Sequence, residues 1–194
     1  KNELIDEQSY AVRVASDDQP AQQDQLLAEA YAAYQRRLRQ ANALDFDDLI
    51  MTTVNILQAF PDVAEHYRRR FRHILVDEYQ DTNHAQYVLV RELVGGPGTS
   101  RAAREGGPEV RPGELVVVGD ADQSIYAFRG ASIRNIEEFE QDYPDAEIIL
   151  LEQNYRSTQT ILRAANAVIA RNEGRRAKNL WTDSGDGAQI VGYV

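Results

Sequence analysis

Apolar residues recur at helical spacing through the first third of the chain. Between residues 22 and 39 they form one stripe, which predicts an amphipathic helix. A second stripe follows Asp47 and stops near Pro61, and a third, shorter stripe covers residues 63–71. We expect these stripes to be core: Leu27, Tyr31, Tyr34 and Leu38 in the first, Ile50, Val54 and Leu57 in the second, and Val63, Tyr67 and Phe71 in the third.

The pattern changes after residue 73. Short, continuous apolar runs occupy residues 74–76, 115–118 and 148–151, with helical patterns between them. Such runs are typical of parallel strands that helices bury on both faces, so the sequence predicts an α/β fold. Ligands of open parallel sheets gather beyond the carboxyl ends of the strands, and polar clusters follow all three runs. The strand ends are therefore the first place to look for function.

Composition changes this picture in two places. Residues 95–113 hold half of the chain's 12 glycines and half of its 6 prolines, which predicts a flexible surface loop. The formal net charge of −10 argues against a dedicated nucleic-acid-binding module, because such modules carry excess Lys and Arg to neutralise phosphates. Arginine-rich clusters at residues 68–72 and 171–178 are more simply interpreted as solvated helix faces.

Length and residue types exclude several classes of protein. The 194 residues, 43% of them hydrophobic, suffice for a globular core. With no cysteine, neither a disulfide framework nor a cysteine-based metal site can form. No apolar run approaches membrane-spanning length, and no secretory signal is visible. The first residue is Lys1 rather than methionine, which suggests a piece of a longer protein.

The first polar cluster, residues 77–83, places Asp77 and Glu78 directly after a predicted strand. The two carboxylates of such a pair can have different roles: one holds a hydrated Mg²⁺ and the other activates a water. Nucleotide-hydrolysing proteins use this Walker B arrangement. Alternatively, Asp81 or Asn83 merely caps the next helix, and Asn83 with Gln86 has capping-box spacing.

The second cluster, residues 119–131, begins with polar residues that could face a phosphate. It continues with Tyr126, Phe128 and Arg129, a combination suited to stacking on unpaired bases while holding a phosphate. The alternative is that the two aromatic residues are core positions at strand-like alternation.

The third cluster, residues 151–157, contains Tyr155 and Arg156 just before a helix whose expected stripe is Ile161, Ala165 and Val168. An arginine in this place can stabilise charge on a transferring phosphoryl group, as an arginine finger does. Alternatively, it is an exposed side chain, and Ser157 is only an N-cap.

Together and in this order, the three clusters resemble motifs II, III and IV of the UvrD/Rep/PcrA helicases of superfamily one. Residues 44–49 also match the family upstream of motif II. The resemblance implies a bacterial motor with two RecA-like, P-loop NTPase domains that bind ATP and Mg²⁺ in the cleft between them. It further implies movement 3′ to 5′ along single-stranded DNA and unwinding at junctions with duplex DNA, in repair or replication.

The resemblance also assigns roles to residues of this chain. Asp77 would hold Mg²⁺, with Glu78 beside it activating the hydrolytic water, and Gln123 would contact the γ-phosphate. Tyr155 would lie against the adenine and Arg156 would reach the γ-phosphate. Gln80 would belong to the network that binds the nucleotide and couples it to DNA. The DNA strand would meet Tyr126, Phe128 and Arg129, although many close relatives have tryptophan where this chain has Phe128.

One motif of the family is absent from the sequence. No G-x-x-x-x-G-K-[ST] loop occurs, so we expect this chain alone not to hydrolyse ATP. The resemblance implies that residues 1–43 are the tail of an inserted helical subdomain and that 44–150 are the latter part of the first RecA-like domain, with 95–113 as its loop. Residues 151–194 would begin the second RecA-like domain, leaving both sheets incomplete.

Two alternatives remain at this point. The chain could belong to a helicase remnant that binds DNA or a protein without turnover, or to an unrelated α/β protein that binds another phosphate ligand. By family resemblance, the partners would be single-stranded DNA, its junctions with duplex, and DNA-repair proteins or RNA polymerase, in the cytoplasm at the nucleoid and not at a membrane.

Overall fold

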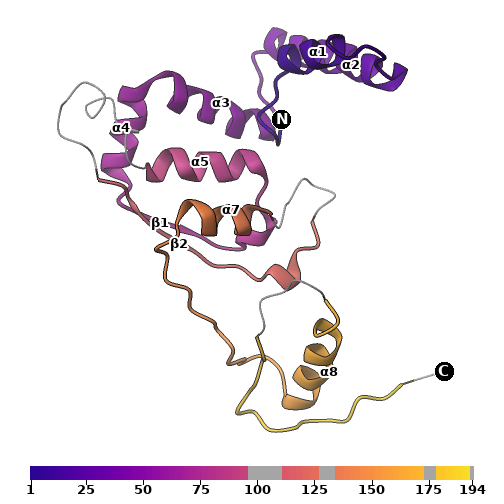
Figure 1. The fold of residues 1–194 in the computed structure, drawn as a ribbon, viewed down its shortest axis with the longest axis vertical. Helices are drawn as coiled ribbons and strands as arrows, with labels where there is room; N and C mark the ends of the chain where they lie inside the picture. The colour runs from indigo at the N-terminus through magenta and orange to yellow at the C-terminus, as the bar shows by residue number, and fades with distance from the viewer. Residues whose placement is uncertain (96–110, 127–133, 173–177, 193–194) are drawn as a thin grey trace. The chain divides into compact units, whose positions relative to one another are not determined.

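The computed structural model describes residues 1–95, 111–126, 134–172 and 178–192 (Figure 1). Contacts divide the chain into two compact units. The first unit contains residues 1–120 and 124–137, and the second contains residues 121–123 and 138–194. Within the described ranges, no helix combines the length and the hydrophobicity that crossing a membrane requires.

The first unit begins with a helical hairpin formed by α1 (Glu7–Ala15) and α2 (Gln22–Gln40). The Asp6 carboxylate caps α1 by accepting a hydrogen bond from the backbone N–H of Ser9. Burial raises the pKa of Tyr31 to about 12, so its hydroxyl remains protonated at neutral pH. That hydroxyl donates to the carbonyl oxygen of Ile5 at 3.0 Å, which ties α2 to the segment before α1.

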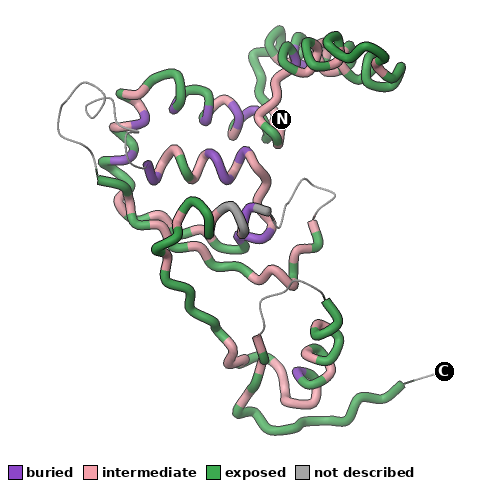
Figure 2. Tube along the Cα trace, viewed as in Figure 1, coloured by how far each residue is buried: buried purple, intermediate pink, exposed green. Residues whose placement is uncertain are grey.

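The core of the first unit lies between α3 (Phe46–Ala59), α4 (Pro61–Arg70) and α5 (His84–Val94). The helix α3 packs against both of the others, and buried positions concentrate on the facing sides of α3 and α5 (Figure 2). Capping boxes begin α3 and α5, and proline occupies the first position of α4. The core side chains of these three helices are Met51, Val54, Leu57, Ala64, Ala85, Tyr87, Val88 and Val94.

Two short strands, β1 (His73–Val76) and β2 (Glu114–Val117), pair in parallel beside these helices. Residue 73 is paired with residue 114 and residue 76 with residue 117, so the two strands end at the same edge. The predicted mixture of helices with a parallel sheet is confirmed, and the first two predicted strands are present. The intervening residues 96–110, most of the predicted flexible loop, lie outside the described residues.

The prediction that helices cover both faces of the sheet is wrong for the described residues. Exposed and half-buried positions alternate along both strands, and Leu75 is 75% exposed while its neighbour Val76 is half-buried. Because successive side chains of a strand point to opposite faces, one face of the sheet is partly covered and the other remains open. An apolar run therefore marked a strand here without showing that both of its faces are buried.

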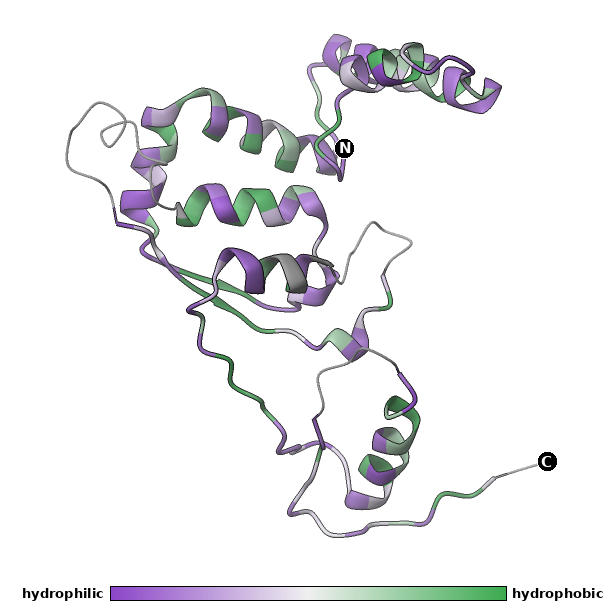
Figure 3. Ribbon diagram, in the orientation of Figure 1, coloured by the Kyte–Doolittle hydropathy of each residue, from purple (hydrophilic) through white to green (hydrophobic). Residues whose placement is uncertain are grey.

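The prediction of a third strand at residues 148–151 is also wrong. These residues form no strand, and all four side chains are exposed. Figure 3 shows the segment as an extended hydrophobic stretch between α7 (Arg134–Asp142) and α8 (Gln159–Ile169). A strand needs a neighbour to satisfy its backbone N–H and C=O groups, and no described segment pairs with this run.

The apolar stripes do lie on helices, but only some of their residues are buried. The second stripe is confirmed, because Val54 and Leu57 are buried and Ile50 is half-buried. Four residues expected in the core of the first and third stripes, and all three of the α8 stripe, are instead exposed: Leu27, Tyr34, Tyr67, Phe71, Ile161, Ala165 and Val168. Periodicity identifies an amphipathic helix, whereas burial also depends on whether another element covers its apolar face.

One arginine of the predicted solvated cluster is in fact buried. Arg68 is 4% exposed, and its guanidinium donates to the backbone oxygen of Glu92 at 2.7 Å and to the carboxylate of Glu92 at 3.0 Å. Because burial of a charge is costly unless it is paired, this contact fixes α4 against α5. The neighbouring Arg69 and Arg70 are exposed, as predicted.

The second unit contains much less buried surface than the first. Among its described residues, Leu162 of α8 is the buried apolar side chain. An isolated parallel bridge pairs Gln153 with Trp181. The carboxamide of Asn166 also donates to the backbone oxygen of Leu180 and accepts from its N–H, which holds α8 against the following segment. Polar contacts thus carry much of the organisation of this unit.

Candidate functional site

The acidic pair lies where β1 ends. Asp77 and Glu78 are both exposed, and the backbone pairing continues past them because the N–H of Tyr79 donates to the carbonyl oxygen of Val118 at 2.9 Å. Between these points Glu78 adopts a left-handed conformation, with φ 49° and ψ 44°. This conformation costs a non-glycine residue about 1 kcal/mol or more, and such strain concentrates at functional sites. The bend places the Glu78 side chain at the open edge of the sheet.

Gln80 follows the pair in the sequence and is 1% exposed. Its Nε2 donates to Glu78 Oε2 at 2.7 Å, and its Oε1 accepts from the backbone N–H of Asp120 at 2.9 Å. One side chain therefore connects the end of β1 with the end of β2. The residue before Asp120 is Gly119, and a Cβ there would lie 2.8 Å from Gln80 Oε1, too close for an ordinary contact.

The capping alternative for this cluster is also confirmed, for Asn83. The Asn83 side chain accepts from the N–H of Gln86 at 3.0 Å, and the Gln86 side chain accepts from the N–H of Asn83 at 2.9 Å. Asn135 adds a contact from a distant part of the chain, donating to the carbonyl oxygen of Thr82 at 2.7 Å. Capping and catalysis do not compete here, because different residues of the cluster serve each purpose.

Asp77 and Glu78 suit a magnesium ion of the kind that keeps most of its water ligands. Asp77 Oδ1 accepts from the N–H of Glu78 at 2.9 Å, while no hydrogen bond from the described residues reaches Asp77 Oδ2. The described residues contain no cluster of three or more His, Cys, Asp or Glu side chains that could hold a metal. Mg²⁺ is commonly bound by one or two carboxylates, with waters and substrate phosphates completing its octahedron. The donor set at the end of β1 fits that coordination.

The second cluster continues from β2 into a short 3-10 turn, η2 (Ala121–Gln123). Gln123 is exposed and Tyr126 is half-buried, and neither lies in a strand. The predicted DNA contacts Phe128 and Arg129 lie outside the described residues. The alternative explanation, that both aromatic residues are core positions, is not tested, because Phe128 lies outside the described residues.

The third cluster forms a tight polar turn before α8. Asn154 Oδ1 accepts from the N–H groups of Arg156 at 2.9 Å and Ser157 at 2.7 Å. The turn leaves Tyr155 82% exposed and Arg156 exposed. The Tyr155 hydroxyl donates to Gln153 Oε1 at 2.9 Å, which fixes the tip of the ring. Thr158, rather than the predicted Ser157, occupies the N-cap position of α8.

The described structure brings together only part of the predicted site. Asp77, Glu78 and Gln80 share the end of β1, whereas Gln123, Tyr155 and Arg156 belong to the second unit. Sequence reasoning missed three features that organise the site. Gln80 is buried, residue 119 must be glycine, and the Asn154 side chain forms the turn before α8. The last had a readable signal, since asparagine often accepts from the backbone two or three residues ahead.

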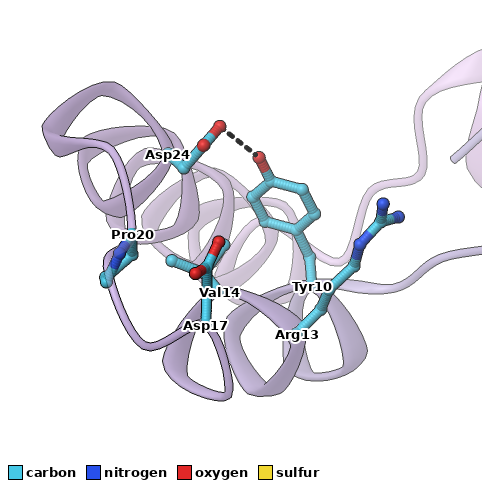
Figure 4. A pocket seen from close by; sticks show the side chains of 6 residues that line it. All are labelled: Tyr10, Arg13, Val14, Asp17, Pro20 and Asp24. Atoms are coloured by element: carbon cyan, nitrogen blue, oxygen red, sulfur yellow. Dashed lines mark hydrogen bonds between the residues drawn. The ribbon is translucent and has the colours of Figure 1, made fainter.

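A hollow also lies beside the helical hairpin, where the loop joins α1 to α2 (Figure 4). The Tyr10 hydroxyl donates to Asp24 Oδ1 at 3.4 Å across it. Within the part of the chain that the structure describes, the hollow contains none of the predicted site residues; its lining is Tyr10, Arg13, Val14, Asp17, Pro20 and Asp24.

Comparison with known proteins gives a consistent result over the whole chain. Residues 1–144 match the model of the UvrD/REP helicase N-terminal domain, and residues 149–193 match that of the UvrD-like helicase C-terminal domain. The chain is 68% identical over 194 residues to the ATP-dependent DNA helicase UvrD1 of Mycobacterium leprae, covering 100% of this chain and 24% of that relative.

Two further relatives are similar along the full chain. Identity is 66% over 194 residues to the ATP-dependent DNA helicase UvrD1 of Mycobacterium tuberculosis, covering 24% of that protein. It is 49% over 193 residues to the ATP-dependent DNA helicase PcrA of Bacillus subtilis, covering 23% of that protein. The chain therefore spans about a quarter of the length of these relatives.

Proposed function

The chain belongs to the UvrD/REP helicase family, and we propose that it forms part of the motor of an ATP-dependent DNA helicase. The observation that supports this proposal most directly is the end of β1, where two exposed carboxylates follow a parallel strand and one is held by a buried glutamine. Phosphoryl-transfer enzymes of this type use positioning and charge stabilisation rather than covalent chemistry. The strand end supplies positioning, and its carboxylates would hold the cation that stabilises charge.

In this proposal the two carboxylates have different roles. Asp77 holds the magnesium ion that accompanies ATP, and Glu78 lies beside it. The ion neutralises charge on the phosphates when bound. Glu78 orients and deprotonates the attacking water, which requires a carboxylate held in one orientation, and the bond from Gln80 Nε2 provides that restraint.

The second unit supplies groups that the first lacks. Arg156 reaches the γ-phosphate, where its guanidinium stabilises the developing charge, and Tyr155 lies against the adenine. The high exposure of both side chains supports these roles, because a residue that meets a ligand in a cleft must not be buried in its own unit. Gln123 contacts the γ-phosphate from the segment after β2.

The DNA strand contacts Tyr126, Phe128 and Arg129 in this proposal, with base stacking as the sequence-independent component. The motor moves 3′ to 5′ on single-stranded DNA and unwinds duplex at junctions, in repair or replication at the nucleoid. DNA-repair proteins or RNA polymerase are its expected protein partners. Residues 44–150 and 151–194 then belong to two RecA-like domains, and residues 1–43 belong to a helical subdomain.

The 194 residues alone should not turn over ATP. Their sequence contains no G-x-x-x-x-G-K-[ST] loop to cradle the β- and γ-phosphates. The full-length helicase that contains these residues is therefore the form in which activity is to be measured.

The test is ATP hydrolysis by that full-length protein, with and without single-stranded DNA, in wild type and Glu78→Gln. We expect DNA to stimulate turnover and Glu78→Gln to lower kcat by about 10²–10⁴-fold while ATP still binds, because the base is lost and the side-chain shape is kept. Glu29→Gln, the same change at an exposed position of α2, is the matched control. A wild-type protein without DNA-dependent turnover would contradict the proposal and favour a non-catalytic binding role.

A further inference from the structure

The buried carboxamide of Gln80 connects two parts of the site that are 40 residues apart in the sequence. A residue that binds nucleotide directly needs polar atoms that a ligand can reach. Gln80 is 1% exposed, and both ends of its carboxamide already have protein partners. This environment favours contacts with protein groups over a direct contact with ATP.

We propose that Gln80 is a positioning residue that holds the Glu78 carboxylate in a fixed position relative to the end of β2. The inference rests on the proposed function, since it assumes that Glu78 activates the hydrolytic water. Gln80 acts only through Glu78 and touches neither nucleotide nor water. Its Nε2 restrains Glu78, and its Oε1 is anchored on the backbone of Asp120.

The chemistry of this contact requires an amide. The Glu78 carboxylate needs a donor and the Asp120 N–H needs an acceptor, and a carboxamide presents one of each in the correct order. A glutamate at residue 80 would keep the acceptor but would place a second carboxylate against Glu78. A methionine of similar size would make neither bond and would take the acceptor away from the N–H of Asp120.

Gly119 supports the inference independently. A Cβ at this position would lie 2.8 Å from Gln80 Oε1 and 3.3 Å from the backbone nitrogens of Tyr79 and Gln80. The close approach of β2 to the carboxamide therefore depends on the absence of a side chain. Of these three neighbours the Gln80 amide is the one that can move, so Gly119→Ala should displace it.

This arrangement also couples Glu78 to the segment after β2. Asp120, whose N–H is bound by Gln80, directly precedes the turn that contains Gln123. Ser124 adds a second contact, its hydroxyl donating to the carbonyl oxygen of Gln80 at 3.4 Å. Gln80 thus bonds both the carboxylate of Glu78 and the segment that leads to Gln123.

The experiment compares Gln80→Glu and Gly119→Ala with wild type in the full-length protein, measuring kcat, KM for ATP, the Kd of a fluorescent ATP analogue, and Tm. We expect kcat to fall about 10–100-fold, because small misplacements of a catalytic group cost rates of this size. KM and Kd should stay within about twofold of wild type. Tm should fall in both variants, because Gln80→Glu buries a carboxylate against Glu78 and Gly119→Ala displaces a buried carboxamide. The matched control is Gln25→Glu, the same change at an exposed position of α2.

A double variant tests whether Gln80 acts through Glu78. In the Glu78→Gln background, Gln80→Glu should cause no further loss of kcat, since the group that Gln80 positions is already gone. Additive losses, a wild-type kcat in both single variants, or parallel changes in kcat and KM would overturn the inference while leaving the helicase proposal intact. Absence of DNA-dependent turnover in wild type would overturn both.

Discussion

The two polar clusters that follow β1 and precede α8 are built in different ways. At the end of β1, the exposed Glu78 is supported by Tyr79 and Gln80, both almost fully buried. Bonds from these two residues reach the segment just after β2, about 40 residues away in the sequence. At residues 153–157, Asn154 organises its own neighbours two and three positions ahead. The first cluster relies on buried side chains. The second combines a local turn with backbone bonds to a distant segment, among them the Asn154 N–H to the carbonyl oxygen of Trp181 at 2.7 Å.

The same contrast extends to the two units. Among the described residues, all buried apolar side chains except Leu162 belong to the first unit. Apolar burial stabilises a unit by roughly 25 cal/mol per Å² removed from water, so the first unit has much the larger driving force for folding. A site that must hold a water-activating carboxylate in place benefits from a well-packed core around it. A site that presents Tyr155 and Arg156 to a ligand needs only a fixed turn.

The largest effect that distinguishes the two clusters is expected from Arg156→Ala. If the turn presents a charge to the γ-phosphate, the substitution should lower kcat for DNA-stimulated ATP hydrolysis by about 10³-fold or more in the full-length protein. Nothing should unfold, because Arg156 is exposed and its described hydrogen bond uses the backbone N–H. Arg36→Ala, an exposed arginine of α2, is the control. An unchanged kcat would remove Arg156 from the site.

The next largest effect concerns stability. In the 194-residue chain, backbone amides of α3 and α5 should exchange hydrogen far more slowly than those of α8. Leu57→Ala should lower the free energy of opening of α3 by about 2–5 kcal/mol, since it leaves a cavity in a packed core. Leu162→Ala should cost less, because few buried apolar groups surround that site. Equal protection of α8 and α3 in the unmodified chain would contradict the contrast between the units.

Sequence patterns were most informative where local rules decide structure. The helix α3 was predicted from its stripe, α5 from its capping box, and β1 and β2 from their apolar runs. Each of these features uses residues close together in the sequence, so a single chain is enough to read it.

The patterns were least informative where a distant partner decides. Residues 148–151 have the composition of a strand but no described neighbour to pair with, and the exposed face of β1 cannot be distinguished by composition from a covered one. Likewise, nothing near Gln80 in the sequence indicates that its acceptor binds the N–H of Asp120. The role of Asp77 and Glu78 followed from a motif, but the group that restrains Glu78 required three-dimensional contacts.

The smallest effect is expected at Asn154, and it tests whether the second cluster is local. Asn154→Ala removes the acceptor for the N–H groups of Arg156 and Ser157, each bond contributing about 0.5–1.5 kcal/mol. The turn should loosen, which would raise KM for ATP by about tenfold in the full-length protein with a smaller change in kcat. Asn154→Asp keeps an acceptor oxygen and should restore most of the affinity, since both residues support such turns. Asn55→Ala, on an exposed face of α3, controls for loss of an amide. If Asn154→Ala leaves KM unchanged, contacts outside the turn hold Tyr155 and Arg156 in place, and the two clusters are built more alike than their hydrogen bonds indicate.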